Sequence, residues 1–218
     1  MKRLETSVHA AISLVFILAS FADEPTRLAA APPNDISLAD QSTPETRVRI
    51  YGFPGLGSYT MRGAEIEATR ILRTTGIEVA WIDCFREAEA ACTNALDTGT
   101  DLIVRILPKA LPRANSRVLG LAVPASESPA AFIFFDRIAT QRTHTRLVPV
   151  MLGRVIVHEI THLLLPDEGH STSGLMKGQM TFDDFDLAGN TFLGLSRHAQ
   201  VRLREEASRR LKTQSRMR

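Results

Sequence analysis

The chain has 218 residues, of which 44% are hydrophobic, 23% charged and 6% aromatic. This length suits one globular domain, and the composition excludes collagen, a disulfide-dense miniprotein and a disordered acidic tail. The formal net charge is only +2, so charge alone gives no sign of a nucleic-acid partner. Two cysteines cannot stabilise a whole fold, so the domain must depend on a hydrophobic core.

The N-terminal segment has the pattern of a secretory signal peptide. Two basic residues precede an apolar run over 10–22, which is too short to cross a hydrocarbon core of about 30 Å as a helix. Small residues favour cleavage after Ala22, with Ala29-Ala30-Ala31 as a second candidate site; a buried amphipathic helix is the alternative interpretation. We therefore expect a signal peptide over 1–22, a proline-rich flexible leader over 23–46 and a folded domain over 47–214. The protein would be secreted or periplasmic, without a membrane span.

Hydrophobic patterns predict a mixed succession of strands and helices. Residues 47–53 alternate as in a strand, and residues 61–75 have apolar positions at helical spacing before a glycine stop. Further strands are predicted at 77–83, 101–107, 118–123 and 131–136, the last of them an apolar run typical of a buried strand. Strands followed by helices indicate an α/β (α+β) layer domain.

The only two cysteines, Cys84 and Cys92, lie eight residues apart, after the second predicted strand. In an oxidising compartment we expect them to form one local disulfide; two free buried thiols are the alternative. Two cysteines without further ligands nearby make a poor zinc site.

Two helices are predicted in the last third of the chain. The first begins near Pro149, because proline suits a first helical turn, and ends at Pro166. The second covers 196–211. Residues 197–218 hold eight Lys or Arg but only two Glu, which is typical of a solvated helix face; binding to nucleic acid or anionic lipid is the weaker alternative.

The first of these helices carries the motif His158-Glu159-x-x-His162. Residues i and i+4 share one face of a helix, so both imidazoles can bind the same zinc ion at about 2.0–2.1 Å. Glu159 projects beside that face and can act as general base on a zinc-bound water, whose pKa zinc lowers toward about 7. A core in which both histidines are merely hydrogen-bonded is the structural alternative.

A catalytic zinc needs a third protein ligand and an open fourth position. The candidates Asp167, Glu168 and His170 follow the Pro166 break, and Gly169 lets the backbone turn so that His170 can return toward the metal. We expect His170 to be the ligand, with Glu168 as the alternative.

From His158 to Met176 the sequence resembles the metzincin form of the zincin metallopeptidases, in particular secreted bacterial matrixin-like peptidases. The resemblance extends over about 47–211, including the Phe134–Arg137 segment and the strand at 101–107. It implies a zincin-like catalytic domain with a twisted mixed sheet, an antiparallel edge strand, an active-site helix and a C-terminal helix. It also implies that Met176 is the methionine-turn residue that supports the site.

One departure from the family pattern concerns the third ligand. The usual spacing puts that ligand six residues after the second histidine and after a glycine, whereas here those positions are Glu168 and Leu165, and His170 lies eight residues after His162. Pro166 and Gly169 can supply the break that the missing glycine normally makes.

The leading hypothesis is a secreted, monomeric zinc metalloendopeptidase that acts on peptide or protein substrates, with no nucleic-acid partner. The strand at 118–123 would border the cleft and hold an extended peptide by backbone hydrogen bonds. An exported zinc-binding protein without peptidase activity is the second hypothesis, and a basic-tailed nucleic-acid binder is the third. The intact Glu159 favours the first, because a structural zinc site has no need of that carboxylate.

Overall fold

The computed structural model describes residues 43–85, 92–93, 100–124, 128–140, 145–180, 184 and 193–217. The predicted signal peptide and all but the last residues of the predicted leader lie outside these ranges. The first strand begins at Glu45, two residues before the predicted start of the domain. No helix in the described ranges is both long and apolar enough to span a membrane.

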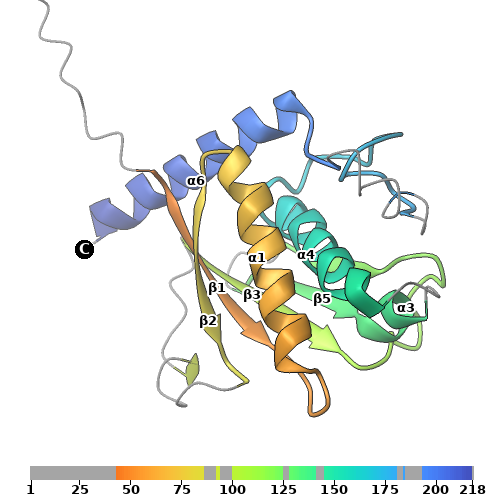
Figure 1. The fold of residues 1–218 in the computed structure, drawn as a ribbon. Coiled ribbons are helices and arrows are strands. Elements are labelled where there is room, and N and C mark those ends of the chain that lie inside the picture. The colour runs from red at the N-terminus through yellow and green to blue at the C-terminus, as the bar shows by residue number, and fades with distance from the viewer. Residues whose placement is uncertain are drawn as a thin grey trace, which may run out of the picture. The chain divides into compact units, whose positions relative to one another are not determined.

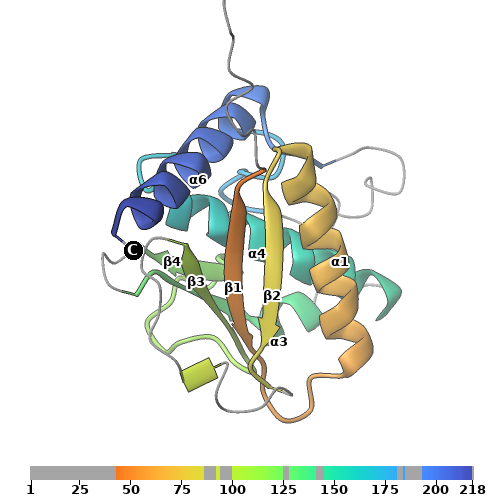
Figure 2. The same cartoon turned by 90° about the vertical axis from the view of Figure 1, so that its left-hand side faces the viewer.

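Five strands form one mixed sheet in the order β2-β1-β3-β5-β4, as Figures 1 and 2 show. Neighbouring strands are parallel except for β4, which is antiparallel to β5 and lies at the sheet edge. This arrangement confirms the predicted mixed sheet and places its antiparallel edge strand within the predicted range 118–123. The strands are β1 (Glu45–Tyr51), β2 (Glu78–Asp83), β3 (Asp101–Leu107), β4 (Gly120–Val123) and β5 (Ala130–Phe134).

Helices α1 (Ser58–Thr74) and α4 (Val148–Leu164) pack against each other and contact the sheet (Figure 1). Alternate strand residues such as Val48 and Val104 are fully buried in the shared core. At Gly153 the two helices approach so closely that a Cβ atom would lie 2.5 Å from the Ala64 carbonyl oxygen. Because a side chain at this position would collide with backbone, glycine allows α4 to pack this tightly against α1.

The C-terminal helix α6 (Arg197–Met217) packs against α4 and β1, and it continues six residues beyond its predicted end at 211. The predicted strand over 131–136 is wrong at its end: β5 stops at Phe134, and helix α3 (Phe135–Ala139) follows directly. The apolar run conceals this change because Phe135 is itself packed, with its ring centroid 5.5 Å from that of Phe53. A short 3₁₀ helix η1 (Thr145–Leu147) precedes α4.

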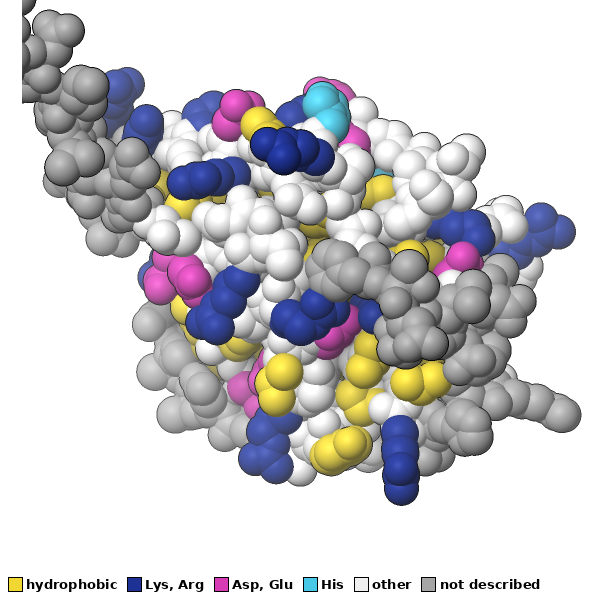
Figure 3. Space-filling model, turned by 45° about the horizontal axis from the view of Figure 1, so that its top comes forward, with side chains coloured by type: hydrophobic (Ala, Val, Ile, Leu, Met, Phe, Trp, Pro, Cys, Tyr) yellow, Lys and Arg dark blue, Asp and Glu magenta, His cyan; other side chains and the backbone are white. Residues whose placement is uncertain are grey.

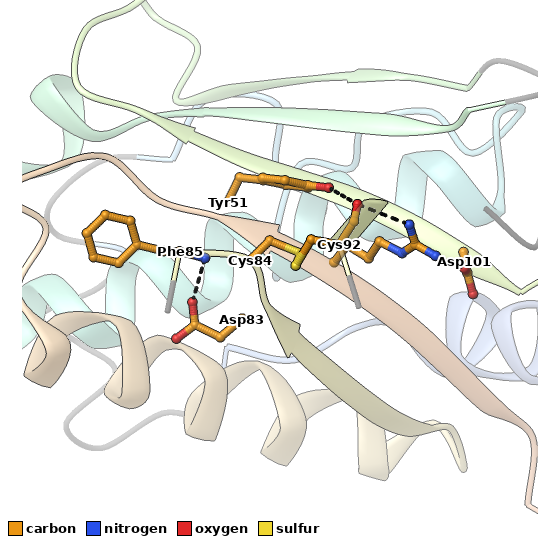
Figure 4. The surroundings of a disulfide bond; sticks show 7 residues. Tyr51, Asp83, Cys84, Phe85, Cys92 and Asp101 are labelled. Carbon is orange, nitrogen blue, oxygen red and sulfur yellow. Dashed lines mark hydrogen bonds and ion pairs between the residues drawn. A yellow bond between two sulfur atoms is a disulfide. The ribbon is translucent and has the colours of Figure 1, made fainter. Parts of the chain in front are cut away.

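Cys84 and Cys92 form the predicted disulfide, which Figure 4 shows with its surroundings. The Cys92 carbonyl accepts hydrogen bonds from the Tyr51 hydroxyl at 3.3 Å and from Arg49 Nη1 at 3.4 Å. Arg49 in turn forms a buried ion pair of 3.1 Å with Asp101. Cys92 is therefore anchored to strand β1 by two hydrogen bonds in addition to its disulfide.

Candidate metal centre and cleft

His158, Glu159 and His162 all lie on helix α4, which is buried in the interior of the protein. Nearly every residue of this helix is buried, and His158 and Glu159 are only 5% and 6% exposed. The i, i+4 spacing puts both imidazoles on one face, where their Nε2 atoms lie 3.2 Å apart. A helix held by the core on almost all sides positions these side chains rigidly.

The chain then leaves the helix at Leu165 and brings His170 back beside the other two rings. His170 Nε2 lies 3.2 Å from His162 Nε2, and ring nitrogens of all three histidines lie within 4.8 Å of one another. Three nitrogen atoms grouped in this way can bind one metal ion. The Glu168 carboxylate does not join them, because it forms an ion pair of 2.6 Å with Arg202 of α6.

A turn after His170 supplies the hydrogen bond that orients His158. The His158 Nδ1–H donates to the Leu175 carbonyl at 2.8 Å, which leaves Nε2 free to act as a metal ligand. Gly174 has a φ of +73°, and its carbonyl accepts a hydrogen bond from the Lys177 N–H, so a tight turn sets the position of Leu175. Met176 is buried in the hydrophobic core, and its carbonyl accepts a bond from the Ser171 N–H.

Burial favours the uncharged forms of His158, His162 and Glu159 in the metal-free protein. It lowers the pKa of His158 to about 4, and the neighbouring His162 and His170 rings lower it further, against the effect of the Leu175 carbonyl. Burial also lowers the pKa of His162. Burial raises the pKa of Glu159 to about 8, although a hydrogen bond from the Ala122 backbone opposes the rise. Neutral imidazole is the form that binds metal.

Glu159 and the three histidines open into one cleft, whose opposite wall contains the edge strand β4. Gly120 of β4 makes room for the carboxylate, because a Cβ atom there would lie 2.7 Å from Glu159 Oε1 and 2.9 Å from its Cγ. The described lining residues come from β4 and the segments on either side of it, from α4, and from the segment after α4: Arg117, Val118, Leu119, Gly120, Leu121, Ala122, Pro124, Val155, His158, Glu159, His162, Pro166, His170, Lys177, Gly178 and Met180.

Some residues that shape the site were not recognised from the sequence. Gly178 lies against the His170 ring, where a Cβ atom would be 3.1 Å from the ring carbon Cγ. Gly120 was a detectable signal, since glycine within a strand often marks a close approach of another group. The Leu175 carbonyl and Arg202 gave no such signal, because their contacts depend on tertiary structure.

The comparisons with known proteins support the fold. Neither a protein-family model nor a curated protein matches the sequence. A crystal structure of a zinc-dependent peptidase from Methanocorpusculum labreanum is similar with a TM-score of 0.53 and 14% identity over 72% of this chain and 99% of that one. An archaemetzincin structure from Methanopyrus kandleri has a TM-score of 0.49 and 14% identity, covering 80% of this chain and 99% of that one. At 14% identity, the likeness to the first structure is a likeness of fold.

The basic C-terminal helix is partly neutralised by ion pairs within the chain. Glu206 binds both Arg209 and Arg210 at 2.7 Å, and Arg202 binds Glu168. On the face shown in Figure 3, lysine and arginine side chains are scattered among acidic, apolar and other polar atoms. Arg202, Arg209 and Arg210 of this helix therefore have acidic partners within the described part of the chain.

Proposed function

We propose that this protein is a zinc-dependent endopeptidase of the metzincin kind. The observation that carries the proposal is one cleft in which three grouped histidines and the buried Glu159 face an antiparallel edge strand. His158, His162 and His170 would hold the zinc ion. Three neutral imidazoles are a ligand set found at catalytic zinc sites, and they leave a fourth position for water or substrate.

When bound, zinc supplies a Lewis acid that polarises the substrate carbonyl and makes a coordinated water a strong nucleophile near neutral pH. Glu159 would accept the proton from the attacking water and return it to the leaving amine. Its burial suits this role, because a carboxylate with a raised pKa can both accept and donate a proton near pH 7. The Ala122 backbone on strand β4 is a hydrogen-bond partner of this carboxyl group.

Strand β4 would hold the substrate. Among the strands that the structure describes, β4 pairs only with β5, so its other backbone edge faces away from this sheet. An extended peptide can add to such an edge by backbone hydrogen bonds. These bonds involve only the main chain of the peptide, so they do not depend on its side chains. Peptides and proteins are therefore the proposed substrates.

We also propose that the protein acts as a monomer outside the cytoplasm, secreted or in the periplasm. The disulfide between Cys84 and Cys92 supports this location, because such bonds persist in oxidising compartments. The sequence pattern of a signal peptide over 1–22 is the second support for this location. These residues lie outside the described part of the structure.

One experiment distinguishes the proposed endopeptidase from the alternative, an exported zinc-binding protein without peptidase activity. Purified full-length protein is loaded with zinc and given a mixed peptide library, beside Glu159→Gln and Glu205→Gln, an exposed control on α6. We expect all three proteins to bind one zinc ion, and only the wild type and the control to cut. Zinc binding without cleavage by any of them, over a broad library, would favour the binding protein.

A further inference from the structure

Helix α6 contacts the loop of the metal centre through one ion pair. Arg202 Nη1 lies 2.6 Å from a carboxylate oxygen of Glu168, whose side chain is only 16% exposed. A second contact joins α6 to the end of α4, where Arg210 Nη2 donates to the Leu163 carbonyl at 3.2 Å. Since Ala199 and Leu203 bury the inner face of α6, the backbone that carries Arg202 is fixed by the core.

Glu168 contacts the site through its backbone. The Glu168 backbone is joined to the His162 ring by a hydrogen bond. Glu168 also lies two residues before His170 in the same short loop. The loop that carries His170 therefore also carries a carboxylate, which is a good zinc ligand in general. The ion pair with Arg202 directs this carboxylate to α6.

We propose that Arg202 is a positioning residue of the metal centre. By holding the Glu168 carboxylate, it keeps that group from replacing an imidazole at the metal and fixes the backbone that orients His162. This inference depends on the proposed function, because it assumes that the three histidines bind zinc. A partner that orients a ligand without touching the metal typically accounts for about 10- to 100-fold in metal affinity.

Two consequences of opposite sign follow. With all three histidines present, loss of Arg202 frees the loop and weakens zinc binding by about 10- to 100-fold. With His170 removed, the same loss frees Glu168 to become the third ligand beside His158 and His162, and zinc binding becomes tighter. A merely structural ion pair would weaken binding in both backgrounds.

The experiment measures zinc affinity by competition with a chelator in the full-length protein. The variants Arg202→Met and Arg202→Lys are made in the wild type, and Arg202→Met is also made with His170→Ala. Arg209→Met is the matched control, because Arg209 forms an ion pair of 2.7 Å with Glu206 of the same helix and not with Glu168. Thermal unfolding shows whether each variant is folded.

We expect Arg202→Met to bind zinc more weakly than Arg209→Met, and Arg202→Lys to retain most of the affinity. His170→Ala with Arg202→Met should bind zinc more tightly than His170→Ala alone, because Glu168 is then free to be the third ligand. Adding Glu168→Gln should abolish that gain. X-ray absorption of the zinc-loaded double variant should then report two imidazoles and one carboxylate.

Equal affinities for the Arg202→Met and Arg209→Met proteins, or no gain in the His170→Ala background, would overturn the inference. A wild type that binds no zinc would overturn the proposed function as well. A wild type that binds zinc but cuts no peptide would overturn the peptidase proposal alone, since the affinities still test the role of Arg202.

Discussion

A single methyl group at Gly120 tests whether strand β4 and Glu159 form one working unit. In Gly120→Ala the new Cβ atom would lie 2.7 Å from Glu159 Oε1, 2.9 Å from its Cγ and 3.0 Å from its Cδ. Real Cβ atoms do not approach other heavy atoms this closely, so something must move. Gly120 is paired with Ile133 in the sheet, which leaves the Glu159 side chain as the group with most freedom to shift.

The size of the effect follows from this collision. Because Cγ is close as well as the terminal oxygen, the whole carboxyl arm must rotate, and it then loses its hydrogen bond from the Ala122 backbone. Overpacking of this kind costs about 1–3 kcal/mol of folding free energy. A displacement of about 1 Å in a catalytic group lowers the rate by about 10²-fold, so kcat should fall far more than zinc affinity.

The assay combines peptide cleavage, zinc content and unfolding by denaturant. Gly120→Ala should keep its zinc, lose most of its kcat and unfold more easily than the wild type. The same substitution in a Glu159→Ala background should cost little stability, because the atoms that collide are then absent. Gly57→Ala is a control with no atom within 4 Å of the added Cβ. Wild-type kcat in Gly120→Ala, or an equal stability loss in both backgrounds, would refute the proposed contact.

Three further predictions concern the same helix. Zinc binding at pH 7 should release about one more proton from the wild type than from Glu159→Gln. The reason is that the Glu159 carboxyl group of the metal-free protein, with a pKa of about 8, loses its proton when a dication binds beside it. Calorimetry in buffers of different ionisation enthalpy measures the number of protons released. In EDTA, the free energy of unfolding of the wild type should fall as the pH rises from about 4.5 to 8, because the folded protein holds the Glu159 proton over that window and the unfolded chain does not. Glu159→Gln lacks this group, so its thermal stability relative to the wild type should rise over the same window. A constant difference would contradict this prediction. Gly153→Ala should lower the unfolding free energy by about 3 kcal/mol or more, since its Cβ would meet backbone 2.5 Å away, whereas a stabilised variant would show that α1 can move aside.

The sequence predicted those parts of the fold that depend on local periodicity. Alternation identified β1, and the apolar face of residues 149–166 identified α4, because both patterns come from side chains that share one face. The change from β5 to α3 was not predicted, since Phe135 is apolar whether it continues a strand or packs on Phe53. Turn and packing partners decide such boundaries, and they are distant in the sequence.

The same division applies to the site. His158, Glu159 and His162 could be predicted together, because four residues make one helical turn. The position of His170 could only be argued from a glycine and a proline, since the loop conformation decides which of its side chains returns to the helix. The partner of Glu168 could not be predicted, because Arg202 follows 34 residues later on another helix.

The buried polar groups of α4 connect the stability of this protein to its chemistry. An isolated buried carboxyl group destabilises a fold unless it is protonated, hydrogen-bonded or placed beside a cation. In the metal-free protein Glu159 depends on protonation and on the Ala122 backbone, and His158 depends on the Leu175 carbonyl. A dication among the three imidazoles would favour the ionised carboxylate near neutral pH. The buried polar groups that make α4 costly to fold are thus the groups that would bind the metal and move the proton in the proposed reaction.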